Sequence, residues 1–83
     1  MPFKSLRESL NSDSYSIIIK KLIYLRHKNN LSQRELANAL SVQQSFISKI
    51  ELGKRRLDIL ELKKYLSKLN YSIPQLLDDL NKI

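Results

Sequence analysis

Residues 31–54 decide how this chain folds, and they read LSQRELANALSVQQSFISKIELGK. Ser32 is followed three residues later by Glu35, the capping-box pattern that starts a helix. We therefore predict a helix that begins at Gln33 and ends after about two turns. Its inward-facing apolar residues are Leu36, Ala37 and Leu40.

A second short helix is predicted at about residues 43–52, directly after the link Ser41-Val42. Its apolar positions are Phe46, Ile47 and Ile50, which leaves one side of the helix polar. Gly53, the only glycine of the chain, stands where the residue after a helix often takes a left-handed backbone. Two short helices joined by so tight a link are predicted to form a helix-turn-helix, and a generic pair of packed helices is the alternative.

Three more helices are predicted around this unit. One begins near residues 12–14 and ends near Lys28, because apolar residues recur there at steps of three and four. The next opens at the Asp58 and Glu61 capping pattern, and the last opens at Ser72 and Gln75. Their predicted apolar stripes are, in order, Tyr15, Ile18, Leu22 and Leu25; Leu62, Leu66 and Leu69; and Ile73, Leu76, Leu77, Leu80 and Ile83.

The length and composition fit one all-α domain. The chain has 83 residues, 42% of them hydrophobic, with one Gly and two Pro, so it lacks the frequent turn residues of strand-rich folds. We expect a single domain over residues 12–83, preceded by an arm or short helix at 1–11. The absence of Cys and of any long apolar run predicts a cytoplasmic protein outside the membrane.

Positive charge gathers in the middle of the chain. The net charge is +7, and residues 20–68 hold twelve Lys and Arg against four Asp and Glu. Such a basic centre is typical of proteins that bind a polyanion. A lysine-rich surface that only contacts water is the alternative on charge alone.

The sequence of residues 31–55 resembles the Cro/Xre-type, lambda-repressor-like helix-turn-helix family, and the resemblance extends over about residues 18–77. It implies a five-helix phage-repressor-like fold whose second and third helices bind DNA. It also implies a transcriptional regulator, often a repressor, that binds specific sequences of double-stranded DNA. Neither an enzyme nor a cofactor is expected, since no nucleophile with a neighbouring base and no metal cluster is apparent.

The resemblance also assigns site residues. The family's base-reading positions fall on Gln43, Gln44, Ser45, Ser48 and Lys49. Gln side chains suit adenine, and Lys suits the acceptors of guanine. Expected phosphate contacts are Gln33, Arg34, Lys54, Arg55 and Arg56, although the last three residues also fit a solvated charge run. The resemblance also implies that Gln33 can hydrogen-bond to a side chain of the base-reading helix, the one expected at about residues 43–52.

Arg26 and Glu51 match a structural ion pair that joins the first and third helices in many family members. A DNA contact by Arg26 is the alternative. The chain departs from the family at Ser41, where a turn glycine is common, and at Gln43, where Ser or Thr usually caps the helix. These departures predict a local cost in stability rather than a change of function.

Two functional hypotheses follow. The first is a homodimer on a near-palindromic operator, with the interface formed by Ile73, Leu76, Leu77, Leu80 and Ile83. Burial of that stripe within the monomer is the alternative. The second hypothesis is an antitoxin-like or regulatory interaction module whose last helix binds a partner protein. The polar face predicted for residues 43–49 favours the first hypothesis, because an interaction helix would more often present apolar residues.

Overall fold

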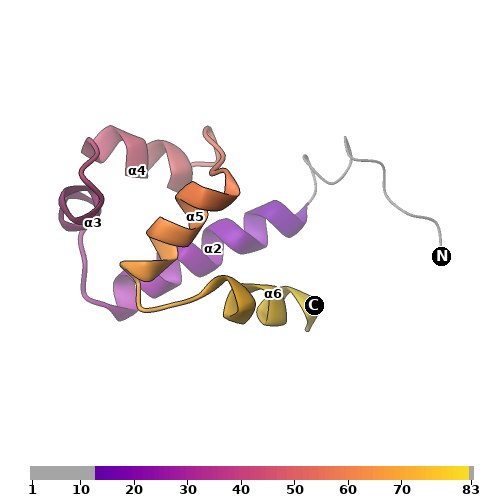
Figure 1. Cartoon of the computed structure of the whole chain (residues 1–83). Coiled ribbons are helices and arrows are strands. Elements are labelled where there is room, and N and C mark those ends of the chain that lie inside the picture. The colour runs from indigo at the N-terminus through magenta and orange to yellow at the C-terminus, as the bar shows by residue number, and fades with distance from the viewer. Residues whose placement is uncertain (1–12, 83) are drawn as a thin grey trace.

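The computed structural model describes residues 13–82, and it folds them into five α-helices without a strand (Figure 1). They are α2 (Asp13–Lys28), α3 (Gln33–Leu40), α4 (Gln44–Glu51), α5 (Ile59–Ser67) and α6 (Ile73–Asn81). The predicted all-α fold is confirmed. The arm expected at 1–11 and the expected interface residue Ile83 lie outside the described residues.

Local hydrogen bonds explain where most of these helices begin. A complete capping box, with both of its reciprocal hydrogen bonds, starts α3, α5 and α6. The pairs are Ser32 with Glu35, Asp58 with Glu61, and Ser72 with Gln75. By contrast, the N-cap of α4 is Gln43, whose side chain makes no capping hydrogen bond. The α4 helix therefore depends on tertiary packing rather than on its own cap.

Left-handed residues follow four of the five helices, α6 being the exception among the described residues. Ser41 has a φ of 57°, and its N–H and that of Val42 donate to carbonyls of the last turn of α3. Gly53 has a φ of 75° after α4. A left-handed backbone suits glycine but costs serine about 1 kcal/mol. The turn between α3 and α4 thus carries the local strain that the missing glycine predicts.

The hydrophobic core lies where α2 meets the other helices. Its buried residues are Leu22, Leu25, Leu36, Ala37, Ile47, Ile50, Tyr65, Leu66, Leu69 and Leu76. In the view of Figure 1, α4 and α6 lie on opposite sides of the molecule, with α2 and α5 between them. The core therefore supports α4 from beneath and leaves the other face of that helix open.

More exposed contacts hold α6 against α2. Tyr71 Oη donates to Asp79 Oδ2 at 2.5 Å, and Lys21 Nζ lies 3.4 Å from the same carboxylate. The Lys21 ammonium also stands 5.1 Å from the centre of the Tyr71 ring, within cation–π range. The hydrogen bond from Tyr71 lowers the pKa of Asp79. This polar clamp, which we define as Lys21, Tyr71 and Asp79, fastens the last helix near the surface.

Candidate nucleic-acid interface

The α4 helix has one buried face and one open, polar face. Ile47 and Ile50 are 0% exposed and anchor the helix in the core. The expected base-reading residues occupy the other side: Gln43, Gln44, Ser45 and Lys49 are exposed, and Ser48 is half-buried. The helix therefore presents amide, hydroxyl and ammonium groups outward from a rigid base.

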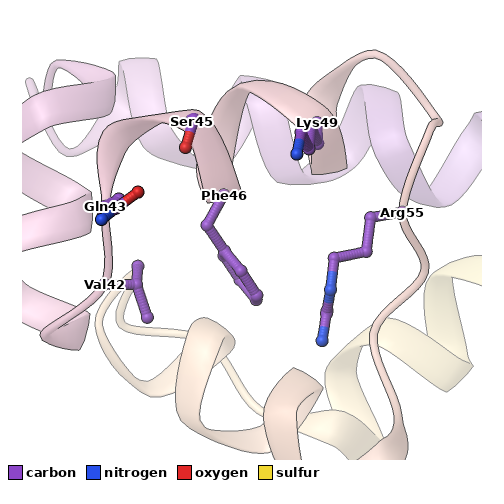
Figure 2. Close-up of a pocket in the computed structure, with 6 residues that line it drawn as sticks. All are labelled: Val42, Gln43, Ser45, Phe46, Lys49 and Arg55. Carbon is purple, nitrogen blue, oxygen red and sulfur yellow. The ribbon is translucent and has the colours of Figure 1, made fainter.

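A hollow lies along the edge of this face, on the side toward the loop between α4 and α5. Its volume is about 400 Å³, and its lining residues are Val42, Gln43, Ser45, Phe46, Lys49 and Arg55. In Figure 2, the Phe46 and Arg55 side chains extend into the space between α4 and α5, while Ser45 and Lys49 stand at its upper rim. Apolar surface is thus brought next to the outward polar groups.

Intramolecular contacts engage the Arg55 guanidinium. Its Nη2 donates to Glu61 Oε2 at 2.9 Å, and its Nη1 donates to the Arg56 carbonyl at 3.0 Å. Its Cζ lies 4.3 Å from the centre of the Phe46 ring. The hydrogen bond from Arg55 lowers the pKa of Glu61, because it favours the charged carboxylate. Arg55 was expected to contact phosphate, and the structure gives it a second role as a support for Phe46.

The other expected phosphate-binding residues differ in how free they are. Arg34 and Lys54 are exposed, at the start of α3 and just after α4. Arg56 is exposed too, and its guanidinium lies 3.8 Å from the centre of the Tyr15 ring. The Gln33 side chain is engaged within the protein, since its Nε2 donates to Glu51 Oε1 at 2.9 Å. One amide N–H of Gln33 remains for an external acceptor.

Arg26 and Glu51 form a bidentate ion pair between α2 and α4. Arg26 Nε lies 2.7 Å from Glu51 Oε2, and Arg26 Nη2 lies 3.0 Å from Glu51 Oε1. The two side chains are only 11% and 7% exposed. Arg26 also donates to the Leu31 carbonyl at 2.8 Å. With Gln33 on the same carboxylate, this junction connects α2, α3 and α4, so the orientation of α4 is fixed from two sides.

The apolar residues of α6 divide between core and surface. Leu76 is 3% exposed and packs into the core of its own chain, while Ile73 and Leu80 are half-buried. Leu77 is 54% exposed and is the most accessible of the stripe. Other large exposed hydrophobic side chains are Tyr24, Leu52, Ile59 and Leu60. None of these four was singled out in the sequence, because each lies off the inward stripe of its helix. Leu52, Ile59 and Leu60 also adjoin a helix end.

Other kinds of site find no support within residues 13–82. This part of the chain holds no group of His, Cys, Asp and Glu side chains that could ligate a metal. None of its helices has the length and apolar character needed to cross a bilayer. The outward face of α4, with the hollow beside it, is the candidate functional site.

The arrangement of α3, the left-handed turn at Ser41 and α4 defines a helix-turn-helix protein. A profile of the Helix-turn-helix family matches residues 22–76, which is well over half of the chain and includes both helices. The chain therefore belongs to the Cro/C1-type Helix-turn-helix family, and it is a DNA-binding regulator of transcription. No curated protein matches it.

Proposed function

We propose that this regulator binds a specific near-palindromic operator in double-stranded DNA as a homodimer. The observation that carries the proposal is the outward polar face of α4, anchored by two fully buried isoleucines and by the Arg26–Glu51 pair. A helix held this firmly can enter the major groove without reorganising, which favours the correct sequence over others.

Base reading is assigned to the exposed end of α4. Gln44 lies in the first turn, the end that enters the major groove in this motif. Its amide can both donate to and accept from one adenine edge. Gln43, Ser45, Ser48 and Lys49 complete the proposed reading surface. Arg34, Lys54 and Arg56 are proposed to bind phosphates from either side of it, with one N–H of Gln33 and the outer side of Arg55 adding to them.

Dimerisation is assigned to the exposed part of α6. Two recognition helices about 34 Å apart are needed to read two half-sites one turn apart. Leu77, with the half-buried Ile73 and Leu80 beside it, offers apolar surface on the helix. A partner protein on the same surface is the second candidate, and the mass of the free protein separates the two.

The decisive experiment is selection of bound duplexes from a random pool. We expect a two-fold symmetric site, and no enrichment would contradict the proposal. On that site, if a dimer neutralises eight phosphates, the logarithm of the binding constant should fall with the logarithm of the salt concentration with a slope of about −7. Gln44→Ala should cost about 1 to 3 kcal/mol at one base position and leave the slope unchanged. Lys54→Ala should weaken selected and scrambled duplexes equally and make the slope shallower.

A further inference from the structure

The hollow beside α4 combines an apolar wall with a polar rim. Val42 and Phe46 provide the apolar part, and Gln43, Ser45 and Lys49 provide polar groups around it. Phe46 is only half-buried, whereas its neighbour Ile47 is 0% exposed. An aromatic ring is therefore left partly open to water beside the polar side chains of Gln43, Ser45 and Lys49 (Figure 2).

The Phe46 ring is supported on one side by Arg55. The Arg55 guanidinium stacks on it at 4.3 Å, and Glu61 and the Arg56 carbonyl hold that guanidinium by hydrogen bonds of 2.9 and 3.0 Å. A ring supported in this way cannot easily turn into the core to hide its surface. The hollow is thus a preformed receptor with an apolar wall, which reduces the ordering cost of binding.

We propose that the hollow receives the 5-methyl group of an operator thymine, which makes Phe46 a specificity-determining residue. This inference rests on the proposed function, because it requires α4 to lie in the major groove. Among the groups that bases display there, the thymine methyl is the apolar one. Thymine O4 lies next to that methyl on the same edge, where the Lys49 ammonium or the Gln43 amide can donate to it.

A phosphate fits the hollow less well than a methyl group. The Arg55 charge on one side is already paired with the Glu61 carboxylate. Inside the hollow, that carboxylate would repel a second anion, and a phosphate against the Phe46 ring would lose hydration without a partner on that side. An uncharged methyl group has neither cost. A phosphate outside the hollow can still meet the outer side of Arg55.

The test uses the full-length protein and the duplex selected above, with thymines replaced one at a time by uracil. Removing the methyl group that occupies the hollow should weaken binding about fourfold for one half-site and about fifteenfold for both. Phe46→Ala should abolish this uracil effect. Leu57→Ala is the matched control, because Leu57 shares with Phe46 the lining of a second, neighbouring pocket but does not line the hollow. It should retain the effect.

A second measurement needs no variant. The critical thymine is replaced by 5-iodouracil, whose iodine takes the place of the methyl group and crosslinks to nearby aromatic rings under light. The tryptic fragment 35–49 contains one aromatic residue, Phe46, so an adduct on that fragment assigns the contact.

The outcomes separate this inference from the proposed function. Failure to select any DNA sequence would overturn both. A selected operator in which no uracil substitution weakens binding, or an adduct mapped to another fragment, would overturn the thymine assignment alone. Loss of affinity only when a neighbouring phosphate is replaced by an uncharged methylphosphonate would instead assign the hollow to the DNA backbone.

Discussion

Removing one side of the Arg26–Glu51 pair should destabilise the whole domain. In Arg26→Met, the Glu51 carboxylate loses donors at 2.7 and 3.0 Å and keeps only Gln33, while its side chain is just 7% exposed. A buried charge left without its partner typically costs about 3 to 5 kcal/mol. The loss is a large share of the total, because a chain of this size has about 4 to 12 kcal/mol of stability.

The expected loss corresponds to a fall in melting temperature of at least about 12 °C, at about 4 to 8 °C per kcal/mol for a domain of this size. Urea unfolding followed by circular dichroism measures the free energy directly. Glu51→Leu should cost a similar amount, since it strands the Arg26 guanidinium. The double variant Arg26→Met with Glu51→Leu should recover much of the loss, because neither charge is then buried alone.

The surface pair of Lys82 and Asp78 provides the matched control. Its atoms lie 3.1 Å apart, but its side chains are 71% and 66% exposed, so Asp78→Ala should cost less than about 1 kcal/mol. The reasoning is refuted if Arg26→Met costs no more than this control. It is also refuted if the double variant loses the full sum of the two single losses, since the two residues would then act independently.

Three further predictions concern the turn, the loop and α6. Ser41→Gly should raise the melting temperature by about 4 °C or more, because glycine removes the strain of a φ of 57°. Asn30 has the same φ, but Asn30→Gly should raise the melting temperature less, since asparagine tolerates a left-handed backbone. The hydrogen bond from Arg55 lowers the pKa of Glu61 in the folded protein below its ordinary value of 4.5. The pairing therefore stabilises the fold fully at pH values above 4.5, and this stabilisation is lost as the pH falls through the lower pKa of the folded state. Glu61→Gln and Arg55→Gln should therefore both flatten the acid side of a melting-temperature profile, and an unchanged acid limb in either would contradict the pairing. Leu77→Glu should shift sedimentation toward the monomer and leave the helicity intact. Leu76→Ala, in the core, should instead lower the free energy of unfolding by about 2 to 5 kcal/mol. An unchanged mass in Leu77→Glu would place the dimer contact elsewhere.

The parts of the fold set by local hydrogen bonds were predictable from sequence. A capping box spans three residues and a glycine at a helix end acts through its own φ, so Ser32, Asp58, Ser72 and Gly53 mark helix boundaries without knowledge of tertiary packing. The polar face of α4 follows from its periodicity in the same way. The family resemblance supplied the pairing of Arg26 with Glu51, which are 25 positions apart and which no local rule connects.

Contacts that cross a loop were not predictable. Arg55 reads as one of three equivalent cations, and only the path of the loop before α5 brings it between Phe46 and Glu61. Tyr65 was also missed. Its ring is 1% exposed, although the chosen stripe of α5 passed through Leu62 and Leu66. An aromatic residue that borders a leucine stripe can be buried or exposed, and the position of the neighbouring helix decides between the two.

The junction at Glu51 also determines how the molecule comes apart. Because one carboxylate ties α4 to both α2 and α3, we expect the amide protons of α4 to exchange slowly with solvent, mainly when the three helices separate. The clamp of Lys21, Tyr71 and Asp79 is closer to the surface and, together with the buried Leu76, holds only α6. We therefore expect the amide protons of α6 to exchange faster than those of the three helices joined at Glu51. A dimer formed through α6 could then dissociate and reassemble without dismantling the helices that read the operator.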